Sequence, residues 1–121
     1  MRIEDLEIYN LSMAFSDKIW NLVSNWEYFS KDTVGKQWVR AADSVDANIS
    51  EGFGRYTSKD SKNFYIIARG SMQESKTWLT KAFRRKLISE IEYQSLLKEW
   101  DTINFKLMNL LKAHNKLMES K

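Results

Sequence analysis

The sequence predicts an all-α protein folded as an up-down-up-down four-helix bundle. Its 121 residues contain no proline and only four glycines, so few positions would interrupt a helix. Apolar residues recur three or four positions apart in four separate stretches, as they do on the buried side of a helix. The connections between these stretches are short, which favours antiparallel neighbours. We therefore expect one four-helix domain over residues 1–121, long enough to bury a core without disulfides.

The first two helices are expected over about residues 5–26 and 34–53. The first stretch contains one apolar row, formed by Ile8, Leu11, Phe15, Ile19, Leu22 and Trp26. Residues 27–33 lose this period, and we expect a loop there. The second helix should end near Gly52 and Gly54, because glycine tolerates the left-handed conformation of a helix cap.

The third helix is expected over about residues 58–85. Thr57 with Asp60 is a weak form of the capping box that begins helices. The inward candidates of this helix are Phe64, Ile67, Ser71, Trp78 and Ala82. Gly70 lies in mid-helix, where glycine costs about 1 kcal/mol relative to alanine. We therefore expect Gly70 to admit the close approach of another helix.

The fourth helix is expected over about residues 89–118. Ser89 and Glu92 form a complete capping box at its start. A heptad seam follows, made of Tyr93, Leu96, Trp100, Ile103, Leu107, Leu110, His114 and Leu117. Four further apolar residues widen it, namely Leu97, Met108, Leu111 and Met118. A helix with so wide an apolar arc must bury more than one side.

The residue inventory argues against an enzyme, a metal site and a cofactor. Without cysteine the chain has no disulfide, thiol nucleophile or zinc-thiolate site. His114 is the single histidine and residue 111 is leucine, so the Glu-x-x-His pairs of bundle metal sites are missing. Haem ligation by His114 and a methionine is the alternative to a packed side chain, which we favour. Gly52 and Gly54 follow a helix and not a strand, unlike the glycines of a phosphate loop.

The sequence also indicates where the protein resides. The first residues, MRIEDLEIYN, lack the basic and then apolar pattern of a signal peptide. No stretch approaches the ~20 apolar residues of a membrane span. We therefore expect a cytoplasmic protein with no membrane partner.

A polar stripe distinguishes the second helix. Its six residues are three or four positions apart and share one helix face: Gln37, Arg40, Ser44, Asn48, Glu51 and Arg55. An apolar row of Trp38, Ala41, Val45, Ile49 and Phe53 lies beside the stripe. Polar groups bordering buried surface need hydrogen-bond partners, so we expect the stripe to be structural and to join this helix to its neighbours. A polar ligand pocket along the stripe is the alternative.

Two sequence blocks carry a family resemblance. The blocks QWVRAADSVDANISEGFGR, residues 37–55, and KNFYIIARGSMQESKTWL, residues 62–79, resemble a four-helix-bundle family encoded by intervening sequences in bacterial large-subunit ribosomal RNA genes. The matching residues of the first block are Gln37, Arg40, Ala41, Ser44, Asn48, Ile49, Glu51, Gly52, Gly54 and Arg55. Those of the second are Phe64, Ala68, Gly70, Ser71 and Glu74. Trp38 departs from the family pattern, which usually has a smaller aliphatic residue there.

The resemblance implies an assembly and partners that the residues alone do not. The family is similar to the accessory variability determinant of diversity-generating retroelements, a ring of five subunits that binds nucleic acid and associates with a reverse transcriptase. A homo-oligomer, with five subunits expected, is therefore implied. RNA or DNA, a reverse transcriptase and a ribosomal component are the implied partners.

Charge is distributed unevenly although the net charge is only +3. Residues 1–34 have a net charge of −3, whereas residues 55–86 contain nine basic and two acidic residues, a net charge of +7. The nine are Arg55, Lys59, Lys62, Arg69, Lys76, Lys81, Arg84, Arg85 and Lys86. Such a segment favours an anionic partner, with nucleic acid as the leading candidate. A solvated face, with the last cations facing the negative end of the helix dipole, is the structural alternative.

These observations lead to two hypotheses for function. The first is a non-enzymatic homo-oligomer that binds nucleic acid, with structured RNA slightly preferred, through phosphate contacts with little sequence specificity. The second is an oligomeric protein-interaction scaffold, or a reverse-transcriptase accessory protein, without a nucleic-acid role of its own. Five tryptophans, five tyrosines and six phenylalanines support the second, because aromatic residues are enriched at interfaces. The salt dependence of binding separates the two.

Overall fold

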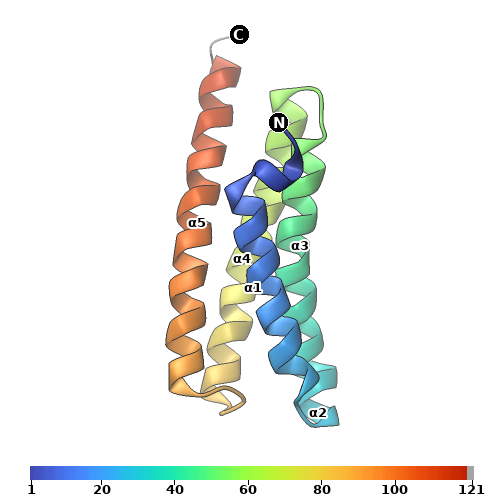
Figure 1. Ribbon diagram of the computed structural model, residues 1–121, viewed down its shortest axis with the longest axis vertical. Coiled ribbons are helices and arrows are strands. Elements are labelled where there is room, and N and C mark those ends of the chain that lie inside the picture. The colour runs from blue at the N-terminus through green and yellow to red at the C-terminus, as the bar shows by residue number, and fades with distance from the viewer. Residues whose placement is uncertain (120–121) are drawn as a thin grey trace.

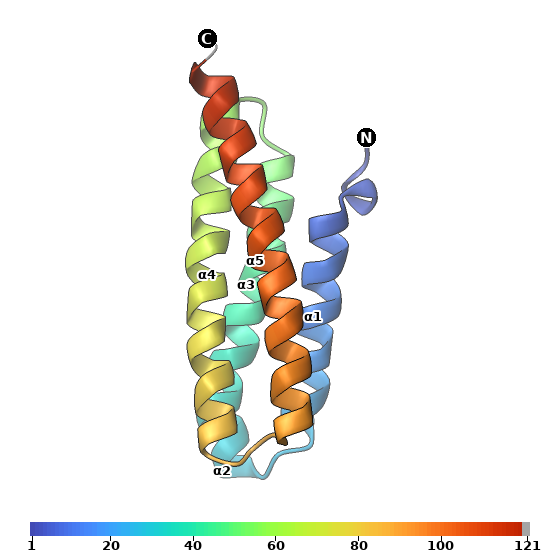
Figure 2. The same cartoon turned by 90° about the vertical axis from the view of Figure 1, so that its left-hand side faces the viewer.

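The four long helices lie side by side and antiparallel in the computed structural model, which describes the backbone of residues 1–119 and the side chains of residues 1–117 (Figure 1). They are α1 (Glu7–Ser24), α3 (Lys36–Phe53), α4 (Ser58–Arg84) and α5 (Glu90–Glu119). Each helix contacts the next along the chain, and α5 returns to contact α1. The predicted all-α, up-down-up-down bundle is therefore confirmed (Figure 2).

The connection between α1 and α3 is helical, so the predicted loop over residues 27–33 is wrong. It contains the short α2 (Tyr28–Ser30) and one π-helical turn (Lys31–Gly35). The turn packs inward, because Val34 and Gly35 are buried. A Cβ atom at Gly35 would lie 2.5 Å from Cγ1 of Val23, so only glycine lets the turn approach α1 this closely.

The helix caps agree with the sequence at two sites and differ at a third. The Thr57 side chain accepts a hydrogen bond from the backbone N–H of Asp60, and Ser89 and Glu92 exchange both bonds of a capping box. Gly54 has an ordinary right-handed conformation, with φ −81°, so the predicted left-handed cap at the end of α3 is wrong. The left-handed conformation occurs at Lys86, with φ 60°, two residues after the end of α4.

The core is filled from all four helices. Large side chains with almost no exposed area include Phe15 of α1, Trp38 of α3, Met72 of α4 and Leu107 of α5. Trp100 of α5 is buried and donates a hydrogen bond from Nε1 to the backbone oxygen of Met72, at 2.7 Å. The Trp100 bond links α5 to α4 within the apolar core, whereas the buried indole N–H of Trp38 has no hydrogen-bond partner among the described residues.

The predicted seam of α5 is buried in its middle and becomes more exposed toward both ends. Leu96, Trp100, Ile103, Leu107 and Leu111 are buried. Tyr93, Leu97, Met108, Leu110 and His114 are half-buried, and Leu117 is half-exposed. The side chain of Met118 lies outside the described residues.

The inward face of α4 is turned away from the predicted one. Tyr65, Met72 and Leu79 are buried, whereas the predicted Ile67 is 50% exposed. Phe64, Ser71 and Trp78 are only half-buried, and of the predicted set Ala82 alone is buried. The predicted row and the buried row both repeat at the helical period, and they lie about 100° apart around the helix. The spacing of apolar residues alone therefore could not show which row is buried.

The glycine that permits close helix packing is Gly52 of α3, and the prediction for Gly70 is wrong within this chain. A Cβ atom at Gly52 would lie 2.5 Å from Cε1 of Tyr65 and 3.0 Å from the backbone oxygen of Ser61. A Cβ atom at Gly70 would meet nothing within 4 Å. Gly70 is exposed on the outer surface of α4.

Candidate nucleic-acid interface

The two sequence blocks that carry the family resemblance meet along the seam between α3 and α4. The hydroxyls of Ser44 and Ser71 share a hydrogen bond of 2.8 Å across it. Asn48 donates to the backbone oxygen of Ser44 at 2.8 Å and to its hydroxyl at 3.0 Å. A guanidinium nitrogen of Arg40 lies 3.8 Å from a carboxylate oxygen of Glu74. The middle of the polar stripe therefore joins two helices through mostly neutral groups.

The two ends of the stripe form bonds within α3 or its C-terminal turn. Arg40 donates to the side-chain oxygen of Gln37 at 2.9 Å, and Arg55 donates to Glu51 at 3.1 Å. The Glu51–Arg55 pair is exposed, and the guanidinium of Arg55 also lies 4.5 Å from the ring centre of Phe64. Exposed ion pairs contribute little to folding, so these ends are not required to hold the helices together.

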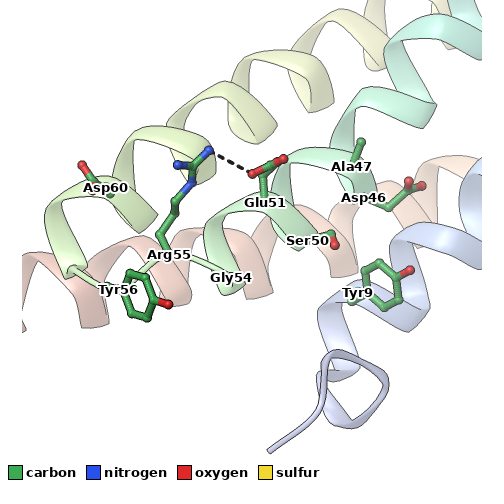
Figure 3. A pocket seen from close by; sticks show the side chains of 9 residues that line it. All are labelled: Tyr9, Asp46, Ala47, Ser50, Glu51, Gly54, Arg55, Tyr56 and Asp60. Atoms are coloured by element: carbon green, nitrogen blue, oxygen red, sulfur yellow. Dashed lines mark hydrogen bonds and ion pairs between the residues drawn. The ribbon is translucent and has the colours of Figure 1, made fainter.

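An open polar hollow lies at the C-terminal end of the stripe, where α3, α1 and the α3–α4 connection meet (Figure 3). Its volume is about 590 Å³. Figure 3 shows Arg55 turned toward Glu51, with Tyr56 and Tyr9 at opposite sides. Carboxylates outnumber cations here, with Asp46, Glu51 and Asp60 against Arg55. The hollow therefore lacks the positive charge that an anionic ligand needs.

Asp46 is a buried carboxyl group that the sequence reasoning missed. It lies on α3 facing α1, where the Ser16 hydroxyl donates to Oδ2 at 2.8 Å. Burial raises the pKa of Asp46 to about 6, and the nearby Asp43 and Asp17 carboxylates add to the rise while the Ser16 bond opposes it. The available sequence signal was the pair of aspartates three positions apart in ADSVD, Asp43 and Asp46, beside the apolar row.

Three of the nine predicted binding cations form a line along α4. Lys62, Arg69 and Lys76 are seven residues apart, and such steps rotate by only about 20° around a helix. Their flank faces α5, because Lys76 Nζ lies 4.4 Å from the ring centre of Trp100 and Arg69 lines a surface hollow with Asn104. Their charges can therefore act on one extended partner along the bundle.

Three more cations gather at the end of the bundle where α4 turns into α5. Arg84, Arg85 and Lys86 are exposed. Lys86 occupies the left-handed position of the turn, and Leu87 completes it by donating to the backbone oxygen of Ala82 at 2.8 Å. Glycine is favoured at this position, so a lysine there gives up a little stability. The turn therefore presents a cation where the fold alone would favour glycine.

The remaining three cations lie apart from these two groups. Lys59 is exposed in the first turn of α4, and Lys81 lies 5.0 Å from the ring centre of Trp78. Arg55 is the only one of the nine with an ion pair among the described residues. The other eight charges are thus not neutralised by a carboxylate of the described chain. The structure brings six of the nine into two groups and leaves three dispersed.

The single histidine, His114, lies on α5 and packs against Tyr65 of α4. The ring centres of His114 and Tyr65 are 5.1 Å apart and meet edge to face. Burial lowers the pKa of His114, and a hydrogen bond to the backbone of Ser58 acts in the opposite direction. Within the described residues no group of three or more His, Asp or Glu side chains could hold a metal ion. None of the described helices is both long and apolar enough to cross a membrane.

Comparisons with known proteins agree with the fold and the two sequence blocks. The profile of the family described as 23S rRNA-intervening sequence protein matches residues 4–109. A crystal structure of a protein of unknown function from the S23 ribosomal protein family of Bacteroides thetaiotaomicron VPI-5482 is similar, with a TM-score of 0.78 and 26% sequence identity. The similarity covers 87% of this chain and 98% of that chain. A search of curated proteins returned no match. Since its profile covers most of the sequence, the chain belongs to the 23S rRNA-intervening sequence protein family.

Proposed function

We propose that this protein is a non-enzymatic homo-oligomer that binds nucleic acid through the cations of α4 and of the turn after it. The observation that supports the proposal most is the set of eight cations without a carboxylate partner within the described residues. Internal ion pairs would use up such charges, whereas free ones can neutralise phosphates and release counterions.

The contacts should position the nucleic acid without reading its sequence. Lysine and arginine side chains dispersed along one helix reach phosphates, and they do not present the paired donors and acceptors that discriminate bases. Structured RNA is the ligand to test first. The family description and the family of the similar crystal structure both name ribosomal components, so a fragment of 23S ribosomal RNA is a reasonable probe.

A closed ring of identical subunits, with five expected, is part of the proposal. Gly70 leaves open space on the outer surface of α4, and the neighbouring Ile66 and Ile67 are 49% and 50% exposed. Phe105 of α5 is also largely exposed. Exposed apolar side chains on two helices of one subunit can contribute to the two unlike halves of a ring interface. Light scattering at micromolar concentration should give about five times the monomer mass, and a monomer would contradict the ring.

The binding proposal is tested by reversing charge at the α4–α5 turn. Arg84→Glu with Arg85→Glu should weaken RNA binding and flatten its salt dependence without unfolding the bundle, because both side chains are exposed. Lys112→Glu with Lys116→Glu is the matched control. It makes the same change in charge at exposed positions of α5 outside the predicted set.

The two variants separate the proposal from its alternative. A loss of RNA binding in the turn variant, with a much smaller loss in the control, supports contacts by the turn. Equal losses in the two variants would mean that net charge alone attracts RNA. An oligomer that binds no RNA even at low salt would contradict nucleic-acid binding and leave the scaffold function.

A further inference from the structure

A second basic surface lies at the end of the bundle that contains α2 and the α4–α5 turn (Figure 2). It contains exposed aromatic rings. Trp20 of α1 is 59% exposed, and Tyr28 of α2 is 78% exposed. Both line a groove of about 630 Å³ whose floor includes Val23 and Val39. Phe29, next to Tyr28, is 73% exposed. Large aromatic side chains on a monomer surface, gathered at one groove, indicate a binding site.

The rim of this groove, which we call the corner groove, is positively charged. Lys31, Lys36 and Arg40 line it, against the single carboxylate of Asp32. Neither Lys31 nor Lys36 has an ion-pair partner among the described residues. An apolar floor with aromatic rings and a cationic rim matches the two parts of a nucleotide, its base and its phosphate.

The corner groove lies on the α1 and α3 side of the bundle, and it shares one end of the bundle with part of the region already proposed to bind nucleic acid. The π-helical turn beside it contacts α4, and Arg40 at its rim lies 3.8 Å from Glu74 of that helix. The α4–α5 turn with Arg84 and Arg85 lies at the same end of the bundle (Figure 2). An RNA bound at the α4–α5 turn would therefore reach the groove around this end of the bundle.

We propose that the corner groove binds unpaired nucleotides of an RNA, with Trp20 and Tyr28 stacking on bases and Lys31 and Lys36 contacting phosphates. This inference rests on the proposed function, but it assigns a different surface and a different part of the ligand. The α4 cations would position the RNA by its phosphates, whereas the groove would select for bases that are not paired. Stacking accepts every base, so the selection is for single strands and not for a sequence.

The test uses two double variants that keep the charge of the protein. Trp20→Ala with Tyr28→Ala removes the groove aromatics, and Tyr56→Ala with Ile91→Ala removes two exposed apolar side chains outside the groove and outside the proposed ring interface as the matched control. The full-length proteins are titrated with an oligouridylate of about 12 nucleotides and with an RNA duplex of similar length at low salt. Circular dichroism melts verify that each variant is folded, and light scattering gives its oligomeric state.

The groove variant should bind oligouridylate at least tenfold more weakly than the parent, the size expected for losing one or two stacked bases. Its affinity for the duplex and its oligomeric state should be unchanged, and the control should bind both probes like the parent. Unchanged oligouridylate binding in a folded groove variant would overturn this inference while the proposed function stands. A groove variant that dissociates to a smaller oligomer would overturn it too, by assigning the groove to a contact between copies. A parent that binds neither probe would overturn both proposals.

Discussion

The seam between α3 and α4 is held together differently from the seams that α1 makes with its neighbours. Between α3 and α4 the contacts are mostly neutral, with Ser44 bonded to Ser71 and the Ser61 hydroxyl bonded to the backbone oxygen of Gly52 at 2.7 Å. Around α1 the polar contacts are ionic or acidic, although its buried face is apolar. Lys18 pairs with Glu99 of α5 at 2.6 Å, and Ser16 holds the buried Asp46 of α3.

This difference explains why cations remain free on one helix. A seam built from serines and a glycine needs no charge to hold it, and no lysine or arginine of α4 pairs with a carboxylate among the described residues, although Lys76 and Lys81 lie over the rings of Trp100 and Trp78. The cations that bridge α1 and α5 are used internally, since Lys106 also pairs with Glu7 at 3.2 Å. Free cations on a helix whose packing is neutral are available for an outside partner, and that availability underlies the proposed function.

The largest expected effect on the neutral seam comes from Gly52→Ala. The added Cβ would lie 2.5 Å from the Tyr65 ring and 3.0 Å from a backbone oxygen, so α3 and α4 must separate. We expect the free energy of unfolding in urea to fall by about 1–3 kcal/mol. Gly70→Ala is the control, because a Cβ atom at Gly70 would meet nothing within 4 Å. This variant should raise the free energy of unfolding by about 1 kcal/mol. A Gly52→Ala protein as stable as the parent would show that α3 and α4 do not need to approach each other this closely at residue 52.

Asp46→Asn tests the acidic seam between α3 and α1. Burial favours the neutral carboxylic acid and raises the pKa of Asp46 to about 6, compared with about 3.9 in an unfolded chain. Asparagine is neutral, and its side-chain oxygen can still accept from Ser16. We therefore expect the variant to be more stable than the parent by about 1–3 kcal/mol at pH 8.

The pH dependence of that difference follows from the direction of the shift. Between about pH 4 and pH 6 the folded protein retains the Asp46 proton while the unfolded chain loses it, so the contribution of this group to stability falls as the pH rises. Subtracting the stability of the parent from that of Asp46→Asn should give a difference that grows over this range and then levels off. A difference independent of pH would show that Asp46 ionises normally.

Asn48→Ala should have a smaller effect on the neutral seam. The Asn48 amide donates to the backbone oxygen and hydroxyl of Ser44, and all of these groups are partly buried. Losing these two hydrogen bonds should lower the melting temperature by a few degrees, which corresponds to about 1 kcal/mol of stability. An unchanged melt would mean that water replaces the amide at no cost.

Glu51→Ala is expected to have the smallest effect of the series. Its ion pair with Arg55 joins two exposed side chains four residues apart. Such pairs contribute about 0.3–0.5 kcal/mol, so the urea midpoint should move only slightly. The variant also releases Arg55 from its one carboxylate partner among the described residues, so RNA affinity should not decrease. A large loss of stability would place Glu51 in the seam.

The sequence was sufficient for the helices and their order, but not for details that depend on packing. The heptad seam of α5 and its capping box could be recognised because each is a local pattern. The helical corner at residues 28–35 could not, since its helicity depends on Gly35 fitting against Val23. The roles of Gly52 and Gly70 were likewise decided by a tertiary neighbour, because Tyr65 lies over the first and nothing over the second.

The candidate site was predictable in its composition and not in its arrangement. Counting residues found the nine cations of residues 55–86. Their division between the α5-facing flank, the α4–α5 turn and three dispersed positions follows from which side of α4 is buried. The corner groove was not anticipated, because Tyr28 lies within the segment predicted to be a loop, whereas Trp20 lies on the helix before it.

The measurement that tests the central claim most directly is the affinity of the parent protein for a 23S ribosomal RNA fragment as a function of salt concentration. If the free cations of α4 and its turn contact phosphates, the logarithm of the affinity should fall linearly with the logarithm of salt, by about 0.7–0.9 per phosphate contacted. Arg84→Glu with Arg85→Glu should reduce the slope by about two contacts. No binding at low salt, or a slope that the variant leaves unchanged, would contradict the claim that these cations contact RNA.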